Sequence, residues 1–145
     1  MPLHIIKLCV GVDSIEHLAA LDREELKRLK RERRKPELVF QTRQMPKRAG
    51  EIVPGGSVYW VIKGVVQVRQ PLLALRPAKT REGLPACDMV FANTLVAVRP
   101  VPRRAFQGWR YLEESDAPPD LSGDAKAIQK IPESMRRELM ALGLI

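Results

Sequence analysis

The segment Pro102–Leu112, with the sequence PRRAFQGWRYL, concentrates the groups best suited to ligand binding. It holds three arginines with a phenylalanine, a tryptophan and a tyrosine, although aromatic residues make up only 5% of the chain. Flat rings beside guanidinium groups can stack on nucleobases or other planar ligands, while the cations bind phosphates or carboxylates. The residues expected to act in this way are Arg103, Arg104, Gln107, Arg110 and Tyr111. The alternative is a strand in which Phe106 and Trp109 complete the core while the arginines pair with local acids.

Two further basic segments precede Pro102–Leu112 in the chain. Arg23–Lys35 contains eight lysines and arginines, which form either a solvated helix face or a ridge that follows phosphates and releases them at high salt. In Thr42–Arg48 a strand ends at Arg43, and a turn begun by proline then presents Lys47 and Arg48 beside free backbone N–H groups. Such a corner can bind an anion, although an ordinary basic loop has the same composition.

The middle of the chain offers a possible stacking platform. In the strand expected over Ser57–Lys63, alternation places Tyr59 and Lys63 on one face of the sheet and Trp60 on the other. Arg69 or Gln70 from the next strand could share the face of Tyr59 and Lys63. A surface that stacks on bases would lie there, but tyrosines on sheet faces also serve as packing residues.

Signals for catalysis or metal binding are weak. The chain has no Ser-His-Asp order, no Gly-x-Ser-x-Gly segment and no His-Glu-x-x-His helix. His4 and His17 have no evident carboxylate partner, and Asp88 and Asp116 are isolated carboxylates. Two histidines and no Cys-x-x-Cys pair are too few ligands for an ordinary zinc site. We therefore expect no metal and no cofactor, and the sequence indicates no particular reaction.

The length, composition and net charge of the chain describe an ordinary basic domain. The chain has 145 residues, 45% of them apolar, and 25 Lys and Arg against 17 Asp and Glu give a net charge of +8. This length fits a single domain over residues 1–145, and the charge favours anionic partners. The first ten residues are too short and too interrupted for a signal peptide or a membrane span. With Cys9 and Cys87 expected as reduced thiols, the protein is predicted to be cytoplasmic.

Hydrophobic patterning predicts a mixed α+β fold. A helix begins near Asp13 and Glu16 and runs through Arg34. Because Asp22 lies within its apolar stripe and forms a second cap-like pair with Glu25, two shorter helices are the alternative. A terminal helix is expected over Glu133–Leu142. Strands are expected over Leu3–Val10, Leu38–Arg43, Ser57–Lys63, Val65–Leu75, Ala86–Phe91 and Leu95–Arg99. The predicted architecture is a mostly antiparallel, strongly curved sheet or small barrel, flanked by an N-terminal and a C-terminal helix.

A family resemblance extends over most of the chain. The sequence resembles a family of small alphaproteobacterial proteins of unknown function in MPLHIIKL at its start, Thr42-Arg43 with Pro46–Arg48, Gly55–Gly64, Arg69-Gln70, Pro102–Arg104 and Phe106–Leu112. The similarity runs through Pro118 and leaves out mainly the terminal helix, and Ala105 replaces a proline of the family pattern. It implies length and origin but no activity. The glycine-marked strand pair and the basic residues near a turn also resemble PUA-like barrels, some of which bind RNA or modified bases; this is a likeness of fold.

Together these features predict a protein that binds nucleic acid, RNA or single strands rather than duplex DNA. The expected roles are phosphate contacts by Arg43, Lys47, Arg48, Arg103, Arg104 and Arg110, stacking by Tyr59 and Tyr111, and base-edge recognition by Gln70 and Gln107. One alternative is an enzyme that acts on a phosphorylated or carboxylated small molecule, in a deep pocket where Asp88 or Asp116 meets the arginines. The other is an interaction subunit whose basic helix docks an acidic partner.

Overall fold

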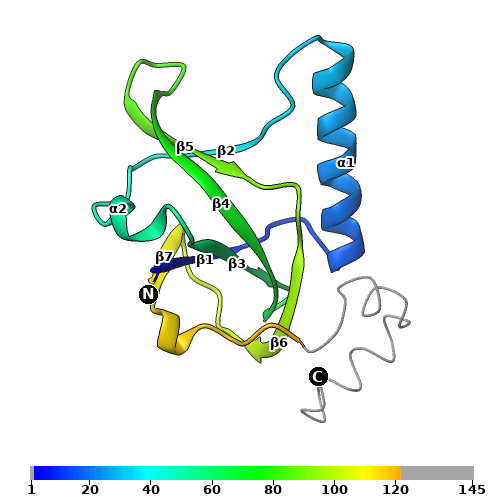
Figure 1. Ribbon diagram of the computed structural model, residues 1–145, viewed down its shortest axis with the longest axis vertical. Coiled ribbons are helices and arrows are strands. Elements are labelled where there is room, and N and C mark those ends of the chain that lie inside the picture. Colours follow the sequence, from blue (N-terminus) through cyan, green and yellow to red (C-terminus); the bar gives the residue numbers. More distant parts are fainter. Residues whose placement is uncertain (1, 122–145) are drawn as a thin grey trace.

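One mixed sheet organises the part of the chain that the computed structural model describes, residues 2–121 (Figure 1). Its strands are His4–Leu8 (β1), Leu38–Thr42 (β2), Ser57–Ile62 (β3), Val65–Lys79 (β4), Pro85–Phe91 (β5), Val96–Pro102 (β6) and Trp109–Leu112 (β7). Their order is β2-β5-β4-β3-β1-β7, and β6 pairs with β4. The helices are Ile15–Arg31 (α1), Ala49–Ile52 (α2) and the short 3-10 helix Glu114–Asp116 (η1). Within these residues no helix has both the length and the apolar character needed to cross a membrane.

The long strand β4 connects the two parts of the sheet. Its first half pairs with β3 and β6, and its second half pairs with β5. The partners change at Pro71, which is opposite Ser57 of β3, and at Leu72, which is opposite Phe91 of β5. The register also shifts between Leu72 and Ala74. Such irregularities bend a strand and increase its twist, so β4 crosses the molecule diagonally (Figure 1).

Strand β1 lies inside the sheet, parallel to β3 and antiparallel to β7. Its Lys7 is opposite both Trp60 of β3 and Trp109 of β7, so these three side chains project to the same face. The main core lies on that face and includes Trp60, with Trp109 packed against it. The other face carries a smaller apolar cluster that contains Ile6 and Tyr59. The two faces of β1, β3 and β7 therefore present different side chains.

The helix α1 is continuous from Ile15 to Arg31. Ser14 caps its N-terminus, because the Ser14 side chain accepts a hydrogen bond from the His17 backbone N–H over 3.1 Å. The expected cap at Asp13 is thus displaced by one residue, and the helix does not break at Asp22. Lysines and arginines in its last turn complement the negative end of the helix dipole.

The predicted fold class is wrong. The sheet is open, because within residues 2–121 its end strands β2 and β7 each pair with one neighbour, and it is mixed because β1 runs parallel to β3. The chain passes through α1, β2 and α2 before β3 is placed beside β1, and a connection of this length permits parallel pairing. In place of two flanking helices, the described residues form α1 and the four-residue α2. The helix predicted over Glu133–Leu142 lies outside the described residues.

Hydrogen bonds and close backbone packing hold the starts of β1 and β3 together. The backbone N–H of Ser57 donates to His4 Nδ1 over 2.9 Å, so Nε2 carries the ring proton and donates to the Glu114 carboxylate. Beside it, a Cβ on Gly56 would lie 2.4 Å from the backbone oxygens of both Ile52 and Leu3. This junction holds η1, and with it the chain that follows β7, against the sheet.

Candidate nucleic-acid interface

Several predicted residues meet around one cavity of about 620 Å³, named here the Trp109 groove. Three parts of the chain form its walls: the loop after β2, the strand β7, and the two arms of the β4–β5 hairpin. The residues that give it chemical character are Arg43, Met45, Lys47, Pro77, Trp109 and Tyr111. The cavity therefore combines two cations with two aromatic rings, and its size is that of a small-ligand site.

The two rings come from alternate positions of β7 and so share one face of the strand. Trp109 and Tyr111 pack edge to face, with ring centroids 5.0 Å apart and planes at 74°. The Tyr111 hydroxyl accepts a hydrogen bond from the Arg48 backbone N–H over 3.2 Å. This contact fixes the loop that carries Lys47 against β7, and it gives the groove a defined wall.

The cations around the groove differ in how far they are compensated. Within residues 2–121, Arg43 and Lys47 are exposed and form no ion pair. Arg48 instead binds both oxygens of Glu51, over 2.7 and 2.8 Å, and Glu113 over 3.1 Å. These carboxylates raise the pKa of Arg48 and neutralise its charge. Arg43 and Lys47 are thus available to an anion, whereas Arg48 is occupied in fixing the loop.

A second group of predicted residues lies around Phe106. The guanidinium carbons of Arg103 and Arg110 lie 5.8 and 5.5 Å from the centre of the Phe106 ring, within the range of cation–π contacts. Arg110 Nη1 also donates to the backbone oxygens of Gln107 and Trp109 over 2.8 and 3.1 Å. Because Arg110 is adjacent to Trp109 in β7, it projects to the opposite face of the strand. Arg104 is exposed between β6 and β7.

Two predicted contact residues are buried in the core. Tyr59 is 4% exposed and Gln70 only 2%. Tyr59 packs edge to face on the His4 ring, with centroids 5.0 Å apart, and burial raises the pKa of its hydroxyl to about 12. The Gln70 amide is held by hydrogen bonds to Trp60, Asp22 and the Ala92 carbonyl. Neither side chain belongs to a surface on which a nucleic-acid strand could lie.

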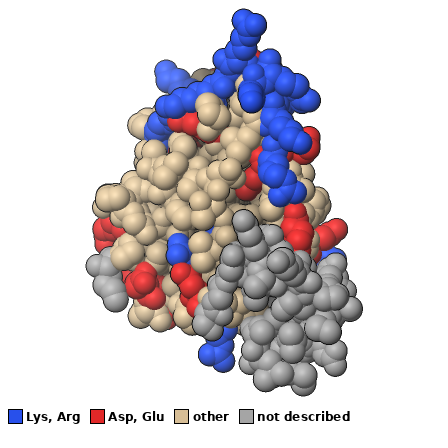
Figure 2. All heavy atoms as spheres, turned by 45° about the vertical axis from the view of Figure 1, so that its right-hand side comes forward, with Lys and Arg blue, Asp and Glu red and all other residues tan. Residues whose placement is uncertain are grey.

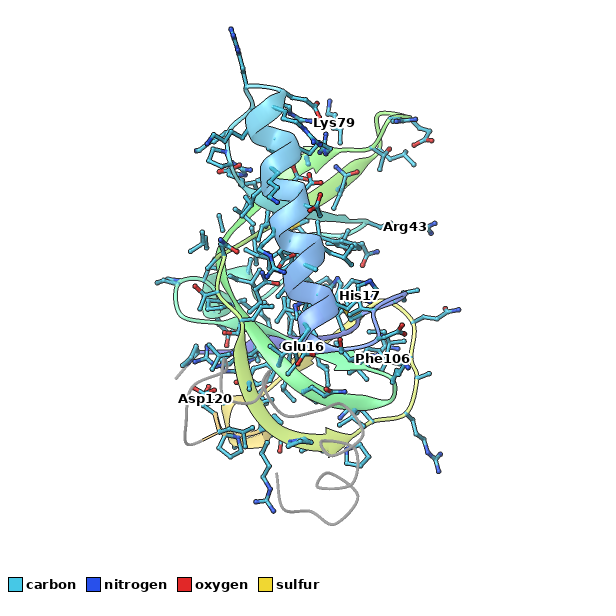
Figure 3. The ribbon with its side chains drawn as sticks, turned by 90° about the vertical axis from the view of Figure 1, so that its right-hand side faces the viewer. Glu16, His17, Arg43, Lys79, Phe106 and Asp120 are labelled. Carbon is cyan, nitrogen blue, oxygen red and sulfur yellow. The ribbon has the colours of Figure 1, made fainter. Side chains whose placement is uncertain are left out.

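Arg69 and Lys63 lie apart from the groove. Arg69 binds both oxygens of Asp120, over 2.7 and 2.8 Å, and also Ser57 Oγ over 3.0 Å. Figure 3 shows Asp120 on the side of the molecule opposite to Arg43, which extends from the end of β2. Lys63 occupies the β3–β4 turn at a φ of 50°, with its Nζ 3.6 Å from an Asp13 oxygen. The predicted residues are thus divided among several surfaces.

The strongest concentration of positive charge lies elsewhere, at the C-terminal end of α1. Figure 2 shows lysine and arginine side chains gathered at this end of the molecule. Between Arg23 and Lys35, eight cations against three glutamates leave a net charge of +5. Four of these cations, Lys27, Lys30, Arg33 and Arg34, line a cavity of about 760 Å³. This α1 basic end is available for long-range attraction of anions.

The carboxylates considered for catalysis do not meet the cations. Asp88 accepts a hydrogen bond from Gln41 over 3.1 Å on the β2–β5 pair, and Asp116 belongs to η1. Neither residue lines the Trp109 groove or the cavity at the α1 basic end. Within residues 2–121, no three His, Cys, Asp or Glu side chains are grouped so as to hold a metal ion.

From the sequence, Lys7 has no expected role, and Trp109 is counted among the rings of Pro102–Leu112 but not among the named contact residues. Lys7 Nζ lies 4.8 Å from the centre of the Phe40 ring, and burial lowers its pKa. The position of Lys7 within a largely apolar strand could have indicated that this lysine has a role. The alternation of Trp109 with Tyr111 was the signal for a shared aromatic face.

Comparison with known proteins identifies a family whose function is unknown. A family described as "protein of unknown function (DUF1489)" matches residues 5–145. This confirms the expected resemblance to a family of unknown function, and the match also includes the segment after Pro118. Neither a curated protein nor a solved structure matches the chain. The PUA-like likeness and the alphaproteobacterial origin gain no support from these comparisons.

Proposed function

The chain belongs to the DUF1489 family of unknown function, and from the surfaces it presents we propose that it binds single-stranded nucleic acid in the Trp109 groove. One observation carries the proposal: Arg43 and Lys47, both without a carboxylate partner among the described residues, share this groove with Trp109 and Tyr111. Cations and rings that line the same cavity suit a ligand that alternates phosphates with flat bases.

The cations supply affinity without sequence preference. Each phosphate that Arg43 or Lys47 neutralises releases counterions from the strand, so binding weakens as salt is added. Two such contacts correspond to a slope of about −1.4 in a plot of log affinity against log salt for a single strand. The α1 basic end adds attraction at long range and accelerates encounter.

The rings favour unpaired bases. A base in a duplex is already stacked on its neighbours, whereas a base in a single strand or loop can be placed on an aromatic side chain. Stacking on one ring contributes about 1–3 kcal/mol per base. Trp109, whose position is fixed by Tyr111 in edge-to-face contact, is the candidate platform.

Fluorescence anisotropy with a labelled single-stranded oligonucleotide, titrated at several salt concentrations, tests the proposal. We expect Arg43→Ala combined with Lys47→Ala to weaken binding at low salt at least tenfold and to flatten the salt dependence. Trp109→Leu should weaken binding about 5- to 150-fold, the range that corresponds to 1–3 kcal/mol. A duplex of the same sequence should bind less tightly than the single strand.

Lys63→Ala is the matched control for the single variants Arg43→Ala and Lys47→Ala, because it likewise removes one positive charge, from a turn that does not line the groove. It should leave affinity within about twofold, the small effect expected of a distant exposed charge. Absence of binding at low salt would refute the proposal. An equal loss in Lys63→Ala and in each of these single variants would show that net charge alone attracts the oligonucleotide.

A further inference from the structure

Another cavity, of about 520 Å³, is lined by residues of α1 and of strands β1 to β5. We name it the Asp22 pocket. Phe40, Trp60 and Phe91 give it aromatic walls, and the Trp60 and Phe91 ring centroids lie 5.7 Å apart. Asp22 and Gln70 supply polar groups in the same pocket. It shares no lining residue with the Trp109 groove, so the two sites can be tested separately.

Asp22 is the unusual residue in this pocket. It falls within the apolar stripe of α1 and is partly buried, yet no cation pairs with it within residues 2–121. Burial raises the pKa of its carboxyl group, against the effect of a hydrogen bond from Gln70. A carboxylate that loses water without gaining a cation lowers stability. Groups retained at such a cost are found at functional sites.

The hydrogen bonds around Asp22 leave one of its oxygens without a donor. Gln70 Nε2 donates to Asp22 Oδ2 over 3.1 Å and to the Ala92 carbonyl over 3.0 Å, while Gln70 Oε1 accepts from Trp60 Nε1 over 3.1 Å. Gln70 is therefore fully engaged and holds the carboxylate in place. Oδ1 of Asp22 accepts no hydrogen bond from the described residues. It is available to a ligand.

The other polar groups of the pocket differ from Asp22. Both oxygens of Glu25 are bound by Arg28, over 2.6 and 3.1 Å. Lys7 lies over the Phe40 ring. Burial raises the pKa of Cys9 to about 12, so at neutral pH it is a thiol and a weak donor. Lys7 and Cys9 can thus donate to a ligand oxygen, and Asp22 is the free acceptor.

The mouth of the pocket is apolar and open. Val10, Leu21, Val39 and Phe40 all line it and are 87, 46, 43 and 43% exposed, respectively. Solvent-exposed apolar side chains gathered at one cavity are typical of a ligand or partner site. A flat apolar ring that enters the pocket would cover them and gain the aromatic contacts of the walls.

We propose that the Asp22 pocket binds a planar heteroaromatic ring through a 2-amino-4-oxopyrimidine edge, the edge that guanine bases and pterins share. The edge presents a ring N–H beside an amino group. These two donors match the two oxygens of Asp22, because Oδ1 is free and Oδ2, which accepts one hydrogen bond from Gln70, can accept a second. The oxo group beside this ring N–H is an acceptor for Lys7 or Cys9. Adenine and cytosine each present an amino group without a neighbouring ring N–H, so they match the carboxylate less well. The cavity volume lies within the range of small-molecule sites.

Tryptophan fluorescence tests the proposal, because the chain has two tryptophans and each lines a different site. In Trp109→Phe protein the signal comes from Trp60 in the Asp22 pocket. We expect guanosine, a pterin or both to change this signal saturably. Inosine, which lacks the 2-amino group, and adenosine should bind at least tenfold more weakly than guanosine if guanosine is the ligand. A response to guanosine alone identifies a nucleobase site, and a response to the pterin alone identifies a pterin site.

Asp22→Asn should weaken binding at least tenfold, and Glu24→Gln is the matched control. Asparagine keeps an oxygen that accepts the Gln70 hydrogen bond, so the fold should persist, which an unfolding titration verifies. Glu24 lies on the same helix, is paired with Lys27 and does not line the pocket, so its replacement should change affinity no more than about twofold, as for other exposed ion pairs.

Three results would overturn the proposal: no saturable signal with any of these compounds, equal binding of guanosine and inosine, or full binding by Asp22→Asn. The two sites share no lining residue, and the signal comes from Trp60 in protein that lacks Trp109, so guanosine binding in the Asp22 pocket is measured separately from the Trp109 groove. Loss of oligonucleotide binding and loss of guanosine binding are therefore distinguishable results.

Discussion

The backbone N–H of Arg48 donates a hydrogen bond to the Tyr111 hydroxyl over 3.2 Å, and the Arg48 guanidinium lies 5.4 Å from the centre of the Tyr111 ring. The two residues are 63 positions apart in the chain. They join the loop after β2 to β7, and these two strands are at opposite ends of the sheet order. One side chain thus holds together the parts of the molecule that form the Trp109 groove.

Tyr111→Phe should loosen this junction. The Arg48 N–H loses its acceptor, and a backbone donor left in a partly buried position lowers the free energy of unfolding by about 1 kcal/mol. A denaturant titration measures this change. Tyr59→Phe is the matched control, because the Tyr59 hydroxyl forms no hydrogen bond with residues 2–121, so its removal should have a smaller effect. Equal destabilisation by the two variants would contradict the role given to the Arg48 contact.

Gly56→Ala should be among the most damaging single-atom additions to this protein. The added Cβ would lie 2.4 Å from the backbone oxygens of Ile52 and Leu3, and backbone atoms cannot move away as a flexible side chain can. We expect a loss of at least about 2 kcal/mol of unfolding free energy, as for other overpacked sites. Gly50→Ala in α2 adds the same atom to open space and should have little effect. Thermal unfolding of the two variants makes the comparison.

Asp22→Asn should stabilise the protein at neutral pH. Because burial raises the pKa of folded Asp22 above its usual 3.8, folding takes up a proton, and stability falls as pH rises from about 3.8 through the folded value. Asparagine removes that cost. The advantage of the variant should therefore be present at pH 7 and disappear below the ordinary pKa of the carboxyl group, as measured by urea unfolding across this range. A variant less stable than the parent at neutral pH would show that Asp22 is structural.

Asp120→Asn should have the opposite dependence on pH. Its hydrogen bonds from Arg69 lower the pKa of Asp120 below its usual 3.8, so the stabilisation is complete above that value and is lost as pH falls through the folded pKa. We expect a loss of up to about 1 kcal/mol at neutral pH, since the pair is partly solvated. Oligonucleotide binding should not change, because Asp120 lies opposite Arg43 (Figure 3). A change in binding would place Arg69 at the interface.

Local patterning predicted the individual elements well. The apolar stripe of Ile15, Leu18, Leu26 and Leu29 predicted α1, and the apolar and β-branched runs predicted strands that begin at Leu38 and Ser57. These signals are local because each element satisfies its own backbone or alternates its own side chains. The pattern did not decide that α1 is a single helix, since the hydrogen bond that Asp22 accepts comes from Gln70 of the distant strand β4.

The sequence alone determined the charge of this protein, its residue periodicities and its supply of rings and cations, because these are properties of residue types and spacing. Tertiary structure decided which strands pair and which cations meet a carboxylate. Parallel pairing of β1 with β3 and the change of neighbours along β4 depend on contacts between distant segments, which periodicity does not record. The same holds for the cations: Arg48 and Arg43 are alike in sequence, but folding brings Glu51 and Glu113 to Arg48. A charge is available to a ligand only where folding brings no carboxylate to it, and that is settled in three dimensions.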